Sequence, residues 1–214
     1  MNNCVLNMTN QLKYLGVIID NKLNWIQHIN YVKNKISKGI GIMYKARPYL
    51  DKKCLANLYH TFIYPYLIYC IEIWGNVPSC HLNPLYLMQK RIIRIITFSN
   101  YLAHTEPIFK QLNILPVNKL YYNRIGIMMY KYNNGQLPEV MSELYKQNNQ
   151  IHSHNTRSSN DFHIASGSDA FSNVSSRTWN TLMSKFDVNV SLSRFKSLSK
   201  SYMLHNDFQI KYTK

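Results

Sequence analysis

Acidic side chains give this sequence little catalytic capacity of its own. The chain contains six Asp and four Glu, and no two of them are adjacent. Two-metal phosphoryl transfer needs carboxylates close enough together to hold two cations. Only Glu139 and Glu143 fall four residues apart on a predicted helix, near its N-terminus, where the helix dipole stabilises acids for structural reasons. The acids therefore predict no catalytic metal centre within this chain.

Cysteine and histidine side chains do not form a zinc-binding pattern. Structural zinc sites use four thiolate or imidazole ligands, usually presented as close pairs, and the four cysteines include no CxxC pair. Cys70, Cys80, His81 and His104 match no compact zinc knuckle by their spacing. No local motif marks a nucleophile, and no glycine-rich loop is suited to cradle a phosphate. The sequence predicts no cofactor in this chain.

Basic side chains carry the stronger signal. With 25 Lys and Arg against 10 Asp and Glu, the formal charge is +15, which attracts polyanions over long range at low salt. Nucleic acid is the first candidate partner, an anionic membrane surface the second, and a solubility bias the third explanation. Lys90 and Arg94 share a helical face and repel one another unless an anion neutralises them. This pair indicates a phosphate-facing side, and a solvated basic face explains it equally well.

Length and composition predict a folded, mostly helical protein. The 214 residues suit one domain or two small helical subdomains, and a hydrophobic content of 46% is enough for a core. The longest apolar run, residues 62–74, contains Pro65 and Glu72 and is too short to cross a bilayer, which predicts no membrane partner. Scattered cysteines and the lack of a signal segment predict an intracellular protein of the cytoplasm or nucleus.

The N-terminal region reads as a strand followed by a helix. In the stretch "KYLGVIIDNKLNW", residues 13–25, Gly16 interrupts a strand-like run. A glycine inside a strand often marks a bulge or the close approach of another backbone. Apolar residues at steps of three and four then predict a helix over 24–47 with Asn24 as its N-cap and a basic outer side that carries Lys35 and Lys38.

Four more helical segments are predicted before a polar connector. Asp51 can cap a helix over 51–74 that is kinked at Pro65, and the next helix begins at Asn83-Pro84. A short turn at Thr105, a helix over 116–135 and a short one over 138–145 follow. Residues 147–176 are rich in Ser, Asn and His and predict an irregular or short-stranded connector. A C-terminal helix capped by Ser191 closes the pattern.

Six short motifs in a fixed order resemble one protein family. They are "KYLGVIIDNKLNWIQHI" (13–29), "YLIYCIEIWGN" (66–76), "LMQKRIIRIIT" (87–97), "NTRSS" (155–159), "WNTL" (179–182) and "FKSLSK" (195–200). Together they resemble the C-terminal part of reverse transcriptases from non-LTR retrotransposons of the jockey and LINE type. The resemblance covers nearly the whole chain.

The resemblance implies a division of the chain and a set of nucleic-acid-binding residues. Residues 1–23 would be a remnant of the palm and primer-grip region, 24–146 a helical thumb-like domain, and 147–214 a connector and C-terminal helix. The fold class is mainly α, with a short N-terminal β-hairpin or strand before the helical bundle. The residues expected to bind nucleic acid are Tyr14, Gly16, Lys35, Lys38, Lys90, Arg91, Arg94 and Arg157.

The resemblance also implies what the chain lacks. The family's polymerase centre uses an Asp-Asp pair and an earlier Asp, all upstream of "YLG", and only twelve residues precede Lys13 here. We therefore expect a fragment of an RNA-directed DNA polymerase that binds an RNA or DNA template-primer, partners the missing palm and fingers, and is inactive alone. Magnesium is expected only for the full-length enzyme. The alternatives are a helical protein-interaction module and a non-functional retrotransposon relic.

Overall fold

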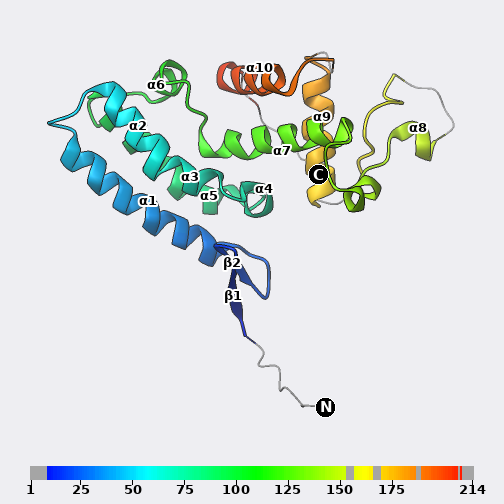
Figure 1. The fold of residues 1–214 in the computed structure, drawn as a ribbon, viewed down its shortest axis with the longest axis horizontal. Coiled ribbons are helices and arrows are strands. Elements are labelled where there is room, and N and C mark those ends of the chain that lie inside the picture. The colour runs from blue at the N-terminus through cyan, green and yellow to red at the C-terminus, as the bar shows by residue number, and fades with distance from the viewer. Residues whose placement is uncertain (1–8, 153–156, 166–169, 187–188, 207, 209–214) are drawn as a thin grey trace. The chain divides into compact units, whose positions relative to one another are not determined.

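The computed structural model describes residues 9–152, 157–165, 170–186, 189–206 and 208. The chain divides into two compact units, Met1–Ile108 and Phe109–Lys214. The fold is mainly α, as predicted, and it begins with a two-stranded antiparallel hairpin (Figure 1). The functional division at residues 23 and 146 stays a prediction.

The hairpin pairs β1 (Gln11–Tyr14) with β2 (Val17–Asp20), with Tyr14 opposite Val17. The prediction of Gly16 inside a strand is wrong, because Leu15 and Gly16 form the two-residue turn. Both have positive φ, 43° and 87°, as expected for a turn whose twist matches that of the strands. Gly16 is therefore explained by the turn, where its left-handed conformation costs least for a glycine.

Helix α1 (Ile26–Ala46) is the long helix predicted from periodicity, and its buried stripe includes Ile29, Val32, Ile36, Ile40 and Met43. Its predicted cap is wrong. Trp25 occupies the N-cap position, and the carboxylate of Asp20 accepts hydrogen bonds from the backbone N–H groups of Lys22, Asn24 and Trp25 at 3.0–3.1 Å. These bonds, that from Asn24 foremost, lower the pKa of Asp20. One acid thus ties the end of the hairpin to the start of α1.

The segment predicted as one kinked helix over 51–74 is three helices, α2 (Lys52–Phe62), α3 (Tyr64–Ile68) and α4 (Ile71–Trp74). Asp51 caps α2 as predicted, since its side chain accepts from the N–H of Cys54. Proline favours the first turn of a helix, and Pro65 stands at the start of α3 instead of kinking a continuous helix. Cys70, with a φ of 51°, separates α3 from α4.

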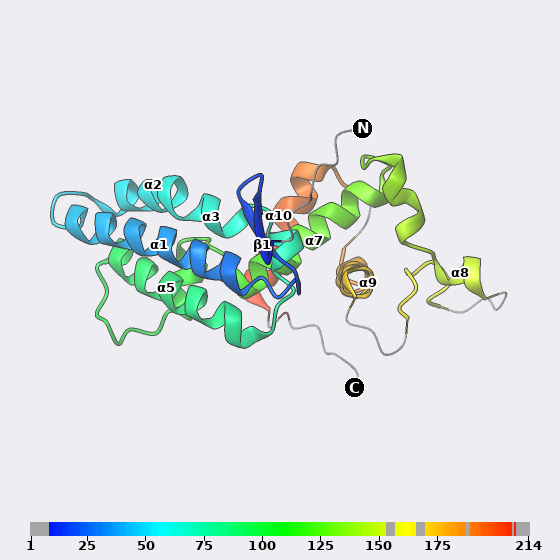
Figure 2. The same ribbon diagram turned by 90° about the horizontal axis from the view of Figure 1, so that it is seen from below.

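Helix α5 (Ser79–Thr97) starts earlier than predicted, with Pro78 as its N-cap and Pro84 inside it. Pro84 lies beyond the first four N–H groups, which need no intrahelical partner, so it removes one backbone hydrogen bond from the second turn of α5. The core of this unit lies where α1, α2 and α5 pack against one another. Figure 2 shows these three helices side by side.

The described part of the C-terminal unit is built on three packed helices, α7 (Val117–Asn133), α9 (Phe171–Met183) and α10 (Leu192–His205). Before them, the short α6 (Glu106–Gln111) includes the boundary between the two units, and α7 follows it. Helix α7 packs against α9 and α10. A 3-10 helix, η1 (Glu139–Leu144), and α8 (Asn148–Ile151) lie between α7 and α9.

The predicted connector over 147–176 is wrong at its end, because residues from Phe171 onward form α9. Its Ser- and Asn-rich sequence hides an amphipathic pattern in which small polar side chains are buried among Val174, Trp179 and Leu182. The predicted C-terminal helix is confirmed as α10, and the Ser191 side chain accepts a hydrogen bond from the N–H of Arg194.

Candidate nucleic-acid interface

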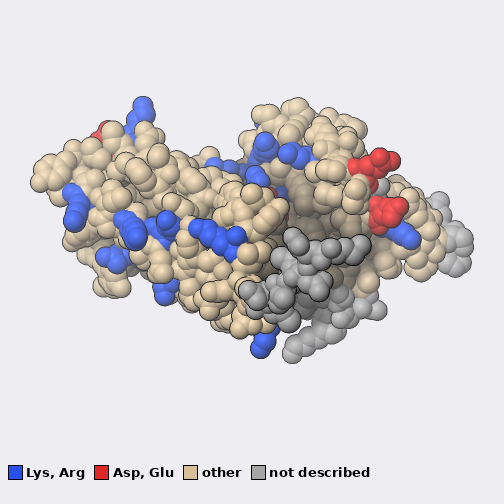
Figure 3. All heavy atoms as spheres, turned by 60° about the horizontal axis from the view of Figure 1, so that its bottom comes forward, with Lys and Arg blue, Asp and Glu red and all other residues tan. Residues whose placement is uncertain are grey.

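The N-terminal unit is strongly basic. It has twelve Lys and Arg against four Asp and Glu. In Figure 3 the blue side chains follow one another along the face of this unit that is turned to the viewer. Exposed cations attract the phosphates of nucleic acid without regard to base sequence.

A hollow of about 700 Å³ between α1 and α5 gathers four of these cations. We call this hollow the basic groove, and its lining residues are Tyr44, Arg47, Leu87, Lys90, Arg91, Arg94, Ile95, Ser99, Tyr101 and Leu102. No acid stands among these described lining residues, so the positive potential of the groove is not offset from within it. Three predicted residues, Lys90, Arg91 and Arg94, therefore come together here.

Side-chain contacts orient the cations of the basic groove. The Nε of Arg94 donates a hydrogen bond of 3.0 Å to the carbonyl oxygen of Ala103, and its guanidinium lies 5.9 Å from the ring centre of Tyr101. The ammonium of Lys90 lies 5.2 Å from the ring centre of Tyr86. Such cation–π contacts hold a charge in place without neutralising it. The predicted repulsion of Lys90 and Arg94 is thus accommodated by aromatic rings.

Arg47, which sequence reasoning missed, completes the groove from the C-cap position of α1. Its guanidinium lies 5.2 Å from the ring centre of Phe98, and its Nε is buried with no hydrogen-bond partner among the described residues. The sequence did hold a signal, since Tyr44 and Arg47 stand three residues apart and so share a helix face. Tyr101 carried no such signal, because it lies in a loop.

The predicted residue Lys35 lies near the hairpin instead, together with Lys13, which was not predicted. Lys13 of β1 and Lys35 of α1 stand over the ring of Tyr31, at 5.0 and 5.4 Å from its centre. Because α1 rises about 1.5 Å per residue, Tyr31 and Arg47 are about 24 Å apart along it. The hairpin cations and the basic groove are therefore separate, and Lys38 is exposed on α1 between Lys35 and Arg47.

The hairpin exposes apolar side chains as well. Tyr14 is 60% exposed and Leu15 is 72% exposed. Gly16 lies beneath the ring of Tyr69, since a Cβ placed on this glycine would stand 3.5 Å from Tyr69 Cε1. Tyr14 is thus accessible to a partner. The group that lies close to Gly16 is a side chain of the protein itself, Tyr69.

Arg157 lies in the C-terminal unit and is exposed. The preceding part of the "NTRSS" motif, Asn155 and Thr156, lies outside the described residues. The Ser158 carbonyl oxygen accepts a hydrogen bond from the Asn148 side chain, which closes this turn on α8.

Several residues of the family-like motifs carry structure. Gln89 is buried in the core and donates a hydrogen bond of 3.0 Å to the hydroxyl of Tyr59. Asn180 accepts from the N–H of Phe162 and donates to its carbonyl oxygen, at 3.1 and 2.9 Å. Asn173, two turns earlier on α9, likewise accepts a hydrogen bond from the N–H of Ala165 and donates one to its carbonyl oxygen. The two asparagine side chains of α9 thus pair with the backbone of Phe162 and Ala165, as the backbone of a neighbouring strand would.

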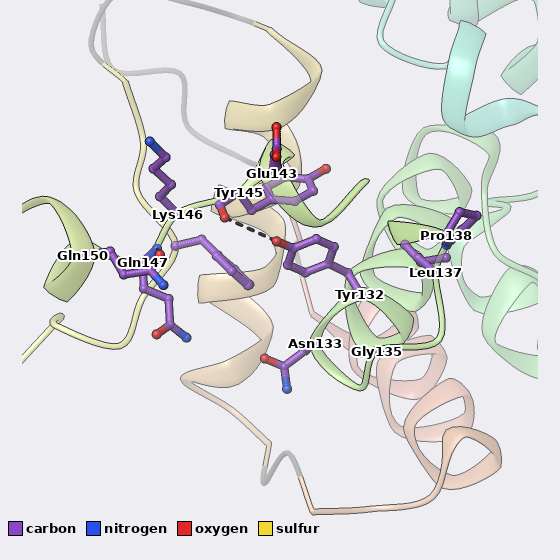
Figure 4. Close-up of a pocket in the computed structure, with 11 residues that line it drawn as sticks. Tyr132, Asn133, Gly135, Leu137, Pro138, Glu143, Tyr145, Lys146, Gln147 and Gln150 are labelled. Carbon is purple, nitrogen blue, oxygen red and sulfur yellow. Dashed lines mark hydrogen bonds between the residues drawn. The ribbon is translucent and has the colours of Figure 1, made fainter. Parts of the chain in front are cut away.

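One hollow of the C-terminal unit is about 1030 Å³ in volume. Figure 4 shows Tyr132 and Tyr145 on its wall, where the Tyr132 hydroxyl donates to the Tyr145 carbonyl oxygen at 3.3 Å. Its other side chains are three amides, three apolar groups, one acid, Glu143, and one cation, Lys146. This mixed lining gives the hollow no marked charge.

Within the ranges that the structure describes, no three His, Cys, Asp or Glu side chains lie close enough to hold a metal ion. Among the same residues, no helix combines the length and the apolar character needed to cross a bilayer.

The chain is thus a mainly helical protein with a basic groove in its N-terminal unit, and about half of it is similar to RNA-directed DNA polymerases of non-LTR retrotransposons. The polymerase from mobile element jockey of Drosophila melanogaster is 27% identical over 105 residues, and that of Drosophila funebris is 29% identical over 111. The probable polymerase from transposon X-element of Drosophila melanogaster is 23% identical over 111 residues.

These matches cover 48–50% of this chain and 12% of each relative. The chain therefore corresponds to a small part of the proteins that it resembles. No family model matches the chain, and no solved structure matches it significantly.

Proposed function

We propose that this chain is part of an RNA-directed DNA polymerase of a non-LTR retrotransposon, and that its N-terminal unit binds the template-primer as a thumb. The observation that carries the proposal is the basic groove, in which Arg47, Lys90, Arg91 and Arg94 converge with no acid among the lining residues. The similarity to polymerases over half the chain supports nucleic acid as the polyanion.

Binding of this kind is dominated by phosphate contacts. Each phosphate that a cation neutralises releases counterions, so affinity falls steeply as salt rises, with little preference for sequence. Catalysis is not part of the proposed role of this chain. In the whole polymerase, magnesium and the catalytic acids would act elsewhere.

Removal of two groove cations tests the proposal. The double variant Lys90→Gln/Arg91→Gln spares Arg94, whose bond to Ala103 is structural. Binding of a fluorescent RNA–DNA hybrid is measured by anisotropy at several salt concentrations. We expect weaker binding and a salt slope, log K against log salt, that is smaller by about 1.8 for the two lost contacts.

A matched control separates the groove from the overall charge. Lys196 and Arg194 are exposed on α10, and Lys196→Gln/Arg194→Gln removes the same residue types. An equal loss of affinity in both double variants would show that only net charge matters. No binding of the hybrid by the unaltered chain at low salt would refute the proposal outright.

The hairpin supports a second role for the same unit, as a surface for the rest of the polymerase. Leu12, Tyr14, Leu15 and Leu23 are each at least 59% exposed, and clustered exposed apolar side chains mark interaction sites. We propose that this surface packs against the palm and fingers of a polymerase. If so, Leu12→Ser/Leu15→Ser reduces self-association in size-exclusion chromatography without changing hybrid binding.

A further inference from the structure

The basic groove is lined by aromatic and apolar side chains as well as by cations. Tyr44 is 59% exposed, Leu87 54%, Tyr101 77% and Leu102 82%. A surface that bound only phosphates would need none of these, because phosphate oxygens take hydrogen bonds and charge. Exposed rings beside cations suit a ligand that has both a negative charge and a flat apolar face.

Tyr101 is placed to offer such a face. Arg94 stands on it at 5.9 Å, and the same guanidinium is fixed by its hydrogen bond to the Ala103 carbonyl oxygen. Most of the Tyr101 side chain is nevertheless open to solvent. A flat group stacked on this ring would therefore lie beside the positive charges of the groove.

Base-paired nucleic acid does not offer a flat face to a groove wall, since its bases are stacked inside the helix. An unpaired nucleotide offers both a phosphate and the face of its base, and single-strand binding sites combine basic grooves with aromatic rings. The volume of about 700 Å³ also lies in the range of about 300–1,000 Å³ of sites for compact organic ligands.

We propose that the basic groove holds an unpaired nucleotide of a single-stranded segment, with its base stacked on Tyr101 and its phosphates held by Arg47, Lys90 and Arg91. This inference rests on the proposed function and sharpens it: the groove takes single-stranded nucleic acid in preference to the paired region of the template-primer. Arg94 positions Tyr101 and adds to the charge.

Tyr101→Ala tests the stacking. Anisotropy is measured with a single-stranded oligonucleotide, the same strand in a blunt RNA–DNA hybrid, and the same single strand with abasic sites in place of its central bases. We expect Tyr101→Ala to weaken binding of the intact single strand about 5- to 150-fold, as the loss of one stacked base implies. Binding of the hybrid and of the abasic strand should change by less than about twofold, because their phosphate contacts remain.

Two further variants serve as controls. Tyr49 is 86% exposed just beyond α1 and does not line the groove, so Tyr49→Ala should leave all three affinities unchanged. Tyr101→Trp retains a stacking face and should keep the preference for the single strand. Circular dichroism checks that each variant is folded.

The outcomes separate this inference from the function on which it rests. Equal effects of Tyr101→Ala on the intact strand, the abasic strand and the hybrid, or no effect on any, would overturn the stacking site while leaving nucleic-acid binding intact. If the unaltered chain bound none of the three, both proposals would fail.

Discussion

The hydroxyl of Tyr69 donates a hydrogen bond of 2.5 Å to the carbonyl oxygen of Leu15, which lies 54 residues earlier in the chain. This bond joins the segment after α3 to the tight turn of the hairpin. A two-stranded hairpin is marginally stable by itself, so contacts with the helices hold it in place. The same Tyr69 ring lies over Gly16.

Loss of this hydroxyl should loosen the hairpin locally. Because the contact is exposed, we expect Tyr69→Phe to lower the free energy of local opening by only about 0.5–1.5 kcal/mol. Amide hydrogen exchange should become faster at residues 11–20 in this variant, with little change in the free energy of global unfolding. Tyr66→Phe removes a nearby hydroxyl with no described bond to the turn, and it should leave exchange unchanged.

Two glycines in α1 should respond to alanine in opposite ways. A Cβ on Gly39 would lie 2.9 Å from Cγ1 of the fully buried Ile63, whereas one on Gly41 would meet no atom within 4 Å. Gly39→Ala should therefore cost about 1–3 kcal/mol by overpacking. Gly41→Ala should gain about 0.5–1 kcal/mol because alanine is the better helix former. Denaturant unfolding of both variants measures the changes, and shifts of the same sign would contradict the described packing of α1.

The buried pair of Tyr59 and Gln89 should be coupled in energy. Gln89 donates to the Tyr59 hydroxyl at 3.0 Å inside the core. Burial raises the pKa of Tyr59, so the hydroxyl stays protonated. Tyr59→Phe should cost about 1–3 kcal/mol, because a buried polar group loses its partner atom. The double variant Tyr59→Phe/Gln89→Met should cost less than the sum of the two single variants, and an additive result in urea unfolding would refute the coupling.

His28 should make stability depend on pH. The imidazole is 2% exposed, its Nδ1 accepts a hydrogen bond of 3.3 Å from the N–H of Ile18, and burial lowers its pKa. The unfolded chain therefore binds a proton at higher pH than the folded protein does. This sign means that stability is complete above the ordinary value of 6.5 and is lost as the pH falls from there toward the lowered pKa.

The free energy of unfolding, measured at intervals of about one pH unit between pH 5 and pH 8, tests the role of His28. We expect His28→Gln to be less stable than the unaltered protein at pH 8 and to lose less stability on acidification. His104→Gln removes an exposed histidine as a control and should keep the original pH dependence. An unchanged pH dependence in His28→Gln would contradict the assignment.

Local patterns in the sequence predicted the helices well where one face is apolar and the ends carry strong signals. The stripe of α1, the Asp51 cap of α2 and the Ser191 cap of α10 were all readable in this way. The same reasoning missed the start of α9, since its buried face includes Asn173 and small hydroxyl residues that look like loop residues. Their burial is satisfied by hydrogen bonds to the connector, which no local pattern reveals.

The sequence by itself determined the mainly helical class, the excess of positive charge and the similarity to retrotransposon polymerases, because composition, periodicity and motif order are local properties of the chain. It also placed Lys90, Arg91 and Arg94 on one helix. Only the tertiary structure decided that Arg47 and Tyr101 join them in a groove, that Gln89 belongs to the core, and that Gly16 serves a turn beneath Tyr69. These relationships join residues far apart in sequence, and packing alone brings them together.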